Sequence, residues 1–151
     1  LEGCARTLRE FDGLAHRMSV VGTVGGVRFV DDSKATTPHA TLAALAGYPD
    51  AVLIAGGRNK GLDLWPLVDG RPRAVVAIGE AASEISSVFD GCCPVQVAGS
   101  MQEAVQAAAL ESGSEGTVLL SPGCASFDWY DSYEERGRDF ARAVTEMVES
   151  S

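Results

Sequence analysis

Three polar segments of the sequence carry residue types that can bind an anion. Residues 31–41 read DDSKATTPHAT, residues 56–63 read GGRNKGLD, and residues 121–133 read SPGCASFDWYDSY. Lysine ammonium groups and serine or threonine hydroxyls are donors that suit carboxylates and phosphates. A plain connector would be expected to use Gly, Asn or Pro rather than a lysine and two carboxylates. The segments are therefore candidates for an anion site.

The elements around these segments predict an α/β fold. Continuous apolar runs alternate with segments of helical periodicity, and the runs lie at 51–57, 73–79, 94–99 and 116–123. This alternation is typical of parallel strands covered on both faces. Two β-rich runs around Gly25-Gly26 predict an N-terminal β-hairpin. We therefore expect a Rossmann-like, doubly wound domain with a mainly parallel sheet, helices on both faces and that hairpin.

Capping residues predict where three of the helices begin. Thr37 is a good N-cap and is followed by proline, which suits the first helical position. The spacing Ser-x-x-Glu, a capping box, occurs at Ser100 and again at Ser132. The segment LWPLV at 64–68 is expected to be a short helix interrupted by Pro66.

Ligands of doubly wound sheets bind beyond the carboxyl ends of the strands. Because each polar segment follows an apolar run, we expect Lys34, Lys60 and Ser126 to converge on an anion site. Taken singly, each lysine can equally be a solvated surface charge. Residues 56–61 do not match the P-loop pattern GxxxxGK[ST], and GTVGG at 22–26 is not GxGxxG. A self-sufficient nucleotide site is therefore not expected.

The composition excludes several classes of protein. The 151 residues include 12 basic and 21 acidic ones, a net charge of −9 that argues against a nucleic-acid partner. No apolar run reaches the roughly 18–20 residues of a membrane helix, and LEGCARTLRE does not resemble a signal peptide. The four cysteines have no zinc-site spacing and are expected to be free thiols of a cytoplasmic protein: Cys4, Cys92, Cys93 and Cys124. No metal site is expected in this chain.

Four blocks of the sequence resemble the Mur ligase family of bacterial wall synthesis, in its D-glutamate-adding branch. DSKAT at 32–36 is similar to the signature of that branch. GLAHRM at 13–18 resembles its Gly-Leu-Pro-His-Arg block, and GGRNKGLD its Gly-Gly-x-x-Lys-x-x-Asp loop. The segment 119–140 resembles its Ser-Pro-x-x-Ala-Ser segment, which ends in Arg-Gly. The resemblance implies that residues 13–151 form the C-terminal, amino-acid-binding domain. Residues 1–12 would be the last helix of the preceding central domain or its linker.

The resemblance also implies a reaction. ATP phosphorylates the carboxylate of UDP-N-acetylmuramoyl-L-alanine, and the amine of D-glutamate then attacks the acyl phosphate. ATP and Mg²⁺ are the implied cofactors, with the P-loop and the metal ligands in the central domain. This chain alone is therefore expected to be inactive, and a cytoplasmic monomer is expected. Two alternatives stay open: a domain of another Mur or folylpolyglutamate-type ligase, and a non-catalytic Rossmann-like interaction module.

By the same resemblance, two groups of residues would contact D-glutamate. Thr36 and Lys60 would hold its α-carboxylate. Ser126 and the backbone at Tyr133 would hold its side-chain carboxylate. Lys34 would be the catalytic residue, because its ammonium would stabilise the charge of the acyl phosphate.

Four residues would contact ATP in the family arrangement. Lys34 and Arg17 would lie near its phosphates, with Arg17 reaching the γ-phosphate when the domains close. Asp32 would accept hydrogen bonds from the ribose hydroxyls. His16 would lie at the hinge near the nucleotide.

Overall fold

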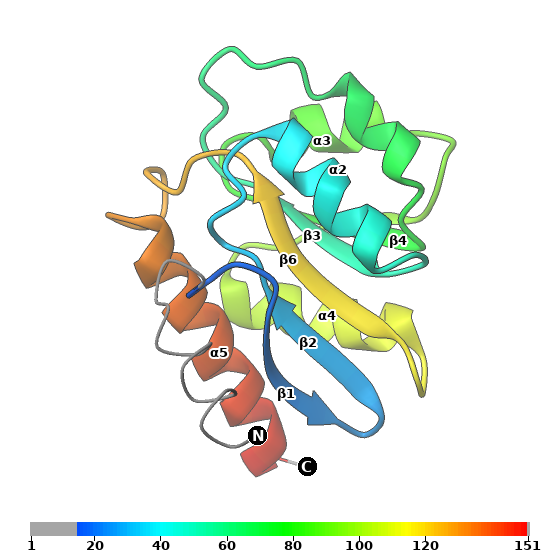
Figure 1. Cartoon of the computed structure of the whole chain (residues 1–151), viewed down its shortest axis with the longest axis vertical. Helices are drawn as coiled ribbons and strands as arrows, with labels where there is room; N and C mark the ends of the chain where they lie inside the picture. Colours follow the sequence, from blue (N-terminus) through cyan, green and yellow to red (C-terminus); the bar gives the residue numbers. More distant parts are fainter. Residues whose placement is uncertain (1–14, 151) are drawn as a thin grey trace, which may run out of the picture.

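The computed structural model describes residues 15–150, which form a six-stranded sheet between two layers of helices (Figure 1). The strands are β1 (Ser19–Val24), β2 (Val27–Asp31), β3 (Val52–Gly56), β4 (Ala74–Ile78), β5 (Val95–Val97) and β6 (Thr117–Gly123). The α-helices are α2 (Pro38–Gly47), α3 (Ala82–Val88), α4 (Met101–Ser112) and α5 (Tyr133–Ser150), and η2 (Trp65–Gly70) is a 3₁₀ helix. The predicted fold class is confirmed. The helix expected over residues 1–12 lies outside the described residues.

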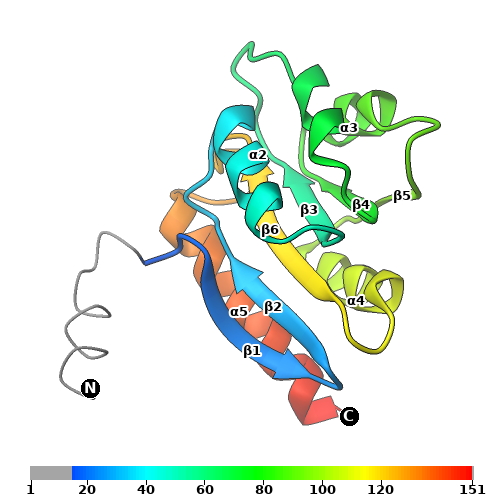
Figure 2. The same ribbon diagram turned by 45° about the vertical axis from the view of Figure 1, so that its right-hand side comes forward.

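The order of the strands across the sheet is β1-β2-β6-β3-β4-β5. Only β1 runs antiparallel to its neighbour, and β2, β6, β3, β4 and β5 pair in parallel. Strand β6 is the last along the chain, yet it lies between β2 and β3 (Figure 2). As a result, the segments that follow β2, β6, β3 and β4 all leave the sheet at one edge.

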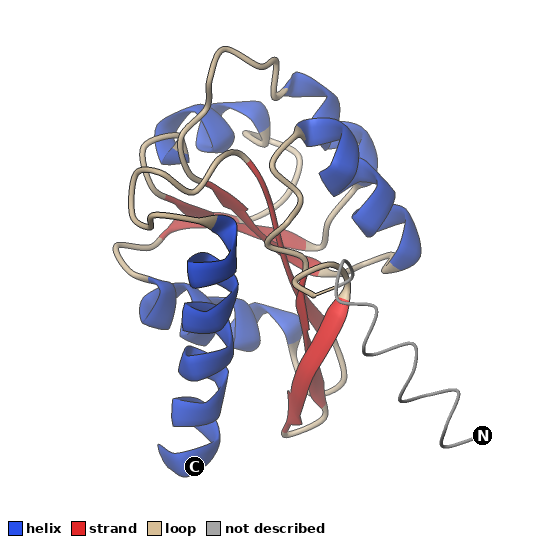
Figure 3. Cartoon of the chain, turned by 60° about the vertical axis from the view of Figure 1, so that its left-hand side comes forward, coloured by secondary structure: helices blue, strands red, loops and turns tan. Residues whose placement is uncertain are grey.

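Helices cover both faces of the sheet (Figure 3). Helices α4 and α5 pack on one face, and α2, η2 and α3 pack on the other. Strand β3 shows how the sequence serves both layers, because successive side chains point to opposite faces. Val52 and Ile54 join the core under α4 and α5, whereas Leu53 and Ala55 join the core under α2 and α3.

The predicted N-terminal hairpin is confirmed. Gly25 and Gly26 adopt φ of 57° and 85°, the left-handed conformation that a tight two-residue hairpin turn requires. A Cβ at Gly26 would overlap the carbonyl oxygen of Ser114, so the turn also lies close to the α4–β6 connection.

The predicted helix starts are confirmed as well. Oγ1 of Thr37 accepts a hydrogen bond from the amide of Ala40 at 3.3 Å, and Pro38 is the first helical residue. Oγ of Ser100 accepts from the Glu103 amide at 3.1 Å. The serine before α5 does the same, since Oγ of Ser132 accepts from the Glu135 amide at 3.1 Å.

Two expectations about local structure are wrong. Pro66 does not interrupt a helix, because it lies in the first turn of η2, where a backbone amide has no helical partner. The run at 94–99 is not a strand buried on both faces. It forms the three-residue edge strand β5, and the side chain of Val97 is 64% exposed. A continuous apolar run therefore does not separate an edge strand from a central one.

Candidate functional site

The segments that follow β2, β3 and β6 enclose a cavity of about 300 Å³, here called cavity A. Thr36 comes from the first segment, Lys60 from the second and Ser126 from the third. Ser126 is almost completely buried, whereas Lys60 is exposed. The remaining lining residues are Arg58, Leu62, Ala125 and Phe127. Two cations and two hydroxyls therefore surround one space, which suits a ligand with carboxylate groups.

Backbone contacts fix the two longer segments of cavity A against each other. The amide of Arg58 donates to the carbonyl of Ala125 at 2.8 Å, and the amide of Ala125 donates to the carbonyl of Arg58 at 3.1 Å. Gly57 makes this approach possible: its φ is 127°, and a Cβ there would overlap the Ala125 carbonyl oxygen. The backbone beside Ser126 is thus tied to the backbone two residues before Lys60.

Side chains then orient the cations of cavity A. The guanidinium of Arg58 forms an ion pair with Glu80, with Nη2 and Oε2 2.9 Å apart. The ammonium of Lys60 lies over the ring of Phe127, 4.8 Å from its centroid, a cation–π contact. Asn59 exchanges two hydrogen bonds with the backbone of Leu62, at 2.8 and 2.9 Å, and so closes the turn that presents Lys60.

A second cavity of about 300 Å³, here called cavity B, lies beside the segment that follows β2. Its polar lining residues are Arg17, Asp32 and Lys34. Its apolar side is formed by the following residues: Met18, Ala35, Ala40, Ala43 and Ala44. Lys34 in cavity B and Thr36 in cavity A are only two residues apart, so this one segment contributes to both cavities.

Asp32 is a buried carboxylate at the edge of cavity B. Its Oδ2 accepts from Oγ of Ser121 at 2.8 Å, and its Oδ1 accepts from the amide of Met18 at 3.2 Å. Burial raises the pKa of Asp32 above its ordinary value, and the two hydrogen bonds oppose that rise. Through the amide of Met18, Asp32 therefore holds the segment that carries Arg17 beside cavity B.

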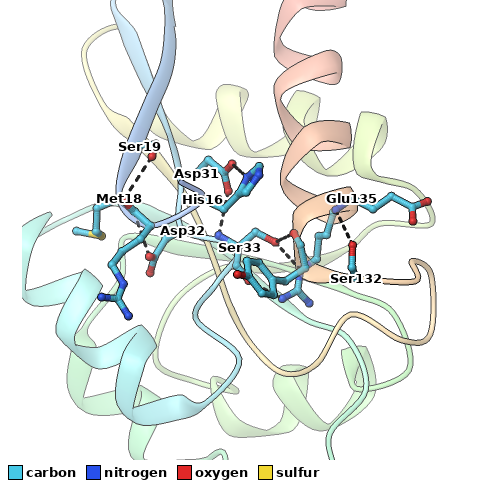
Figure 4. A network of polar contacts seen from close by, with 11 residues as sticks. His16, Met18, Ser19, Asp31, Asp32, Ser33, Ser132 and Glu135 are labelled. Atoms are coloured by element: carbon cyan, nitrogen blue, oxygen red, sulfur yellow. Dashed lines mark hydrogen bonds and ion pairs between the residues drawn. The ribbon is translucent and has the colours of Figure 1, made fainter. Parts of the chain in front are cut away.

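Asp31 joins the same network from the other side (Figure 4). Its Oδ1 accepts from the amide of Ser33 at 2.9 Å, and its Oδ2 lies 2.7 Å from Nδ1 of His16. The carbonyl of His16 accepts from the amide of Lys34 at 3.0 Å. The imidazole also meets the ring of Tyr133 edge-on, with centroids 6.3 Å apart. His16 and Asp31 therefore connect the segment before β1, the segment after β2 and the start of α5.

Arg136 and Gly137 in the second turn of α5 complete this arrangement. The side chain of Arg136 is buried and donates to Ser33 and to the carbonyl of Cys124. Gly137 lies directly against the His16–Asp31 pair, because an added Cβ would overlap Nδ1 of His16. Neither residue was given a role above. Two signals were available: the Arg-Gly pair in the segment that resembles the family, and the place of Arg136 four residues before Phe140 on the buried face of the helix.

The structure brings together six of the eight residues singled out from the sequence, in two sets. Thr36, Lys60 and Ser126 line cavity A, and Arg17, Asp32 and Lys34 line cavity B. Lys34 does not join Lys60 and Ser126 in one cavity as expected. His16 and Tyr133 lie outside both linings. The carbonyl of Tyr133 accepts from Oγ of Ser33 at 2.7 Å, so it is engaged within the domain.

The described residues hold no cluster of metal ligands, and their cysteines are free thiols. Within 15–150 there is no group of three His, Cys, Asp or Glu side chains that could hold a metal ion. Cys124 is buried, and burial raises the pKa of its thiol to about 12, in keeping with a packed thiol. Cys92 is exposed and Cys93 half-buried, and both are free. None of the described helices is long and apolar enough to cross a membrane.

The fold and the two cavities define a Rossmann-like α/β domain whose candidate site lies at the carboxyl edge of its sheet. Residues 16–124 match the family described as Mur ligase, glutamate ligase domain. The chain belongs to the Mur ligase family.

Curated relatives support this assignment over nearly the whole chain. It is 44% identical over 147 residues to the UDP-N-acetylmuramoylalanine–D-glutamate ligase of Chlorobaculum parvum, covering 95% of this chain and 32% of the relative. It is 47% identical over 145 residues to the ligase of the same name from Methylococcus capsulatus, covering 93% and 32%. It is 50% identical over 136 residues to the ligase of the same name from Frankia casuarinae, covering 86% of this chain and 29% of that relative. The chain thus spans about a third of the length of these relatives.

Solved structures share the fold at low sequence identity. The murein peptide ligase of Psychrobacter arcticus superposes with a TM-score of 0.58 at 15% identity, over 85% of this chain and 30% of that one. A domain of a candidate UDP-N-acetylmuramate:L-alanyl-γ-D-glutamyl-diaminopimelate ligase from Haemophilus ducreyi gives 0.57 at 16% identity, over 85% and 99%. These likenesses concern the fold alone.

Proposed function

We propose that this chain is the amino-acid-binding domain of a ligase that adds D-glutamate to UDP-N-acetylmuramoyl-L-alanine. The observation that carries the proposal is cavity A, where Lys60, Thr36 and Ser126 converge from three separate strand ends. The names of the relatives supply the substrate. Residues 13–151 would form this domain, and residues 1–12 the end of the preceding one.

The chemistry of cavity A suits an amino acid with two carboxylates. Lys60 and Thr36 would hold the α-carboxylate, one through charge and the other through its hydroxyl. Ser126 would hold the side-chain carboxylate; the backbone at Tyr133, the second group that the resemblance implies, lies outside the lining of cavity A, and its carbonyl already accepts from Ser33. Arg58 adds a second cation to the lining, already oriented by Glu80. The amine would then be left to face the electrophile.

Cavity B has the groups that a nucleotide needs. Arg17 and Lys34 would take phosphate charge, and the carboxylate of Asp32 would accept from ribose hydroxyls. The alanine side of α2 gives the cavity an apolar wall. His16 would serve at the hinge, since its carbonyl connects the segment before β1 to the segment that carries Lys34. ATP would contact these residues, and Mg²⁺, for which residues 15–150 hold no ligand cluster, would be bound by the central domain that the resemblance implies.

In the proposed reaction this domain binds and orients the amine that forms the new amide bond. ATP supplies the phosphoryl group that activates the carboxylate of UDP-N-acetylmuramoyl-L-alanine. Lys34 would stabilise the phosphate charge as the amine attacks and phosphate leaves. Fixing the amine relative to the acyl phosphate supplies a large share of the rate, because orientation replaces an encounter in solution. The 151 residues alone are expected to be inactive, since residues 56–61 do not form a P-loop.

The test is an amide-formation assay with the full-length ligase, ATP and UDP-N-acetylmuramoyl-L-alanine. D-glutamate, L-glutamate and meso-diaminopimelate are compared as acceptors, and product with D-glutamate alone is expected. Lys60→Ala should raise the KM for D-glutamate by about 10- to 100-fold, the loss of one charged hydrogen bond. Lys34→Ala should lower kcat. Arg73→Ala is the matched control, because Arg73 is a half-exposed cation near the amino ends of the strands.

Each alternative has its own outcome. Preference for L-glutamate or meso-diaminopimelate would refute the D-glutamate assignment and favour another ligase of this family. Growth of a ligase-depleted bacterium on both the Lys34→Ala and Lys60→Ala proteins would refute a catalytic role and favour a non-catalytic module.

A further inference from the structure

Arg136 is a buried cation whose bonds go to neutral groups. Its side chain is 1% exposed. Nε donates to Oγ of Ser33 at 2.9 Å, Nη2 to the carbonyl of Ser33 at 2.8 Å, and Nη1 to the carbonyl of Cys124 at 3.0 Å. Within residues 15–149, none of the hydrogen bonds of this guanidinium goes to a carboxylate.

Such an arrangement is costly for stability alone. Removing a guanidinium from water carries a large desolvation penalty, and apolar side chains of similar volume often fit such positions without loss. Burial lowers the pKa of Arg136 to about 10, so the group still carries its charge at neutral pH. A reason for keeping an arginine here must therefore come from its geometry.

The geometry connects the segments that build both cavities. Ser33 lies between Asp32 and Lys34 of cavity B, and Cys124 lies two residues before Ser126 of cavity A. The segment after β3 also rests on the guanidinium, because a Cβ at Gly57 would lie 3.2 Å from Nη1. The planar fork of arginine can bond two segments at once, whereas a lysine ammonium cannot reproduce those fixed directions.

We propose that Arg136 is a positioning residue that fixes the separation of the segments after β2, β3 and β6, so that cavities A and B keep their shapes together. It touches neither substrate and acts through Ser33 and Cys124. Its effect on kinetics rests on the function proposed above, whereas its effect on the backbone does not.

The test uses the full-length ligase with three variants and one control. Arg136→Lys keeps the charge but loses the fork, and Arg136→Met removes both. Ser33→Ala is the mild variant: it removes the hydroxyl that accepts from Nε and donates to the Tyr133 carbonyl, and it keeps the carbonyl that accepts from Nη2. Arg138→Met is the matched control, an exposed arginine two residues along the same helix. The measurements are the KM values for ATP and D-glutamate, kcat, the unfolding temperature, and amide hydrogen exchange.

Hydrogen exchange reports on the segments after β2 and β6 through two amides. The amide of Lys34 donates to the carbonyl of His16, and the amide of Ala125 donates to the carbonyl of Arg58. In Arg136→Lys both amides are expected to exchange at least about tenfold faster, and both KM values to rise about tenfold. Ser33→Ala should speed exchange at Lys34 and leave Ala125 unchanged. Arg138→Met should change none of these quantities.

Several results would overturn the inference. Arg136→Lys with both KM values and both exchange rates within twofold of the wild type contradicts it. A lower unfolding temperature of Arg136→Lys with exchange raised evenly over the whole domain also contradicts it, because such a result indicates that Arg136 only stabilises the fold. If Arg136→Met fails to fold, Arg136→Lys still decides, since unchanged exchange at both Lys34 and Ala125 refutes the role. A wild-type protein that forms no amide refutes the proposed function instead, and the exchange data still test Arg136.

Discussion

Replacing Gly137 with alanine is expected to destabilise this domain, contrary to the usual effect of that change in a helix. In a helix interior, alanine is favoured over glycine by about 1 kcal/mol. Gly137 lies inside α5, however, and its missing Cβ leaves the space that His16 and Asp31 occupy. An added Cβ would overlap Nδ1 of His16 and lie 2.7 Å from Oδ2 of Asp31. The helix or the His16–Asp31 pair must therefore move.

The magnitude follows from three contributions. Overpacking a filled site costs about 1–3 kcal/mol. Separating His16 from Asp31, which is 3% exposed, costs about 1–3 kcal/mol because a buried carboxylate oxygen loses its partner. The gain in helix propensity offsets about 1 kcal/mol. The net loss is expected to be about 3 kcal/mol, which lowers the unfolding temperature by about 6–12 °C for a chain of this size.

Thermal and urea unfolding of the chain provide the assay. Gly47→Ala is the matched control, a helical glycine whose added Cβ would lie 3.3 Å from the flexible end of Met18. It should change stability by less than about 1 kcal/mol. In the background His16→Ala, the cost of Gly137→Ala should fall by at least about 1 kcal/mol. A Gly137→Ala protein as stable as the wild type, or an equal cost in both backgrounds, would refute the reasoning.

Three further predictions concern the caps, the thiols and pH. Ser100→Ala removes the hydroxyl that caps α4 and should cost about 1 kcal/mol in urea unfolding, whereas Ser86→Ala inside α3 should be nearly neutral; equal costs would contradict this. Mass spectrometry after alkylation of the folded chain at pH 8 should find exposed Cys92 modified and Cys124 protected by burial, and equal rates would be inconsistent with the raised pKa of Cys124. Burial raises the pKa of Asp32 in the folded protein above 3.8, the value expected for the unfolded chain. The unfolded chain therefore loses this proton first, and the free energy of unfolding should fall as the pH rises from 3.8 towards the pKa of Asp32 in the folded protein. The Asp32→Asn protein should not show this decrease. Parallel plots of unfolding free energy against pH for the two proteins would refute the prediction.

Local features of the fold were predictable from the sequence. The glycine pair at 25–26 and the cap at Thr37 act over a few residues, so their conformations follow from the residue types themselves. The position of β6 between β2 and β3 was not predictable. Arg28 pairs with Thr117, and nothing in either segment alone specifies that partner. Strand order depends on long-range packing, which periodicity does not encode.

In the candidate site, too, some features were predictable from the sequence and others were not. The strand-end rule predicted that Lys60 and Ser126 would meet, because both follow parallel strands of one sheet. It did not predict that Lys34 would line a different cavity, since that depends on how one short segment turns between its neighbours. Arg136 received no role, because an arginine in an amphipathic helix is usually solvent-exposed. Its sequence signals were its place four residues before Phe140 and the Arg-Gly pair in the segment that resembles the family.

The place of β6 also has a consequence for how the domain forms. A chain that ends before residue 117 holds the β1–β2 hairpin and the strands β3, β4 and β5 as two pieces, each with an unpaired strand edge. Unpaired edges of this kind are prone to pair with other chains. During synthesis the sheet can close only when its central strand leaves the ribosome, near the end of translation of this domain. Cavity A, which includes Ser126, and the contact of Arg136 with Cys124 therefore form only after β6 has been synthesised.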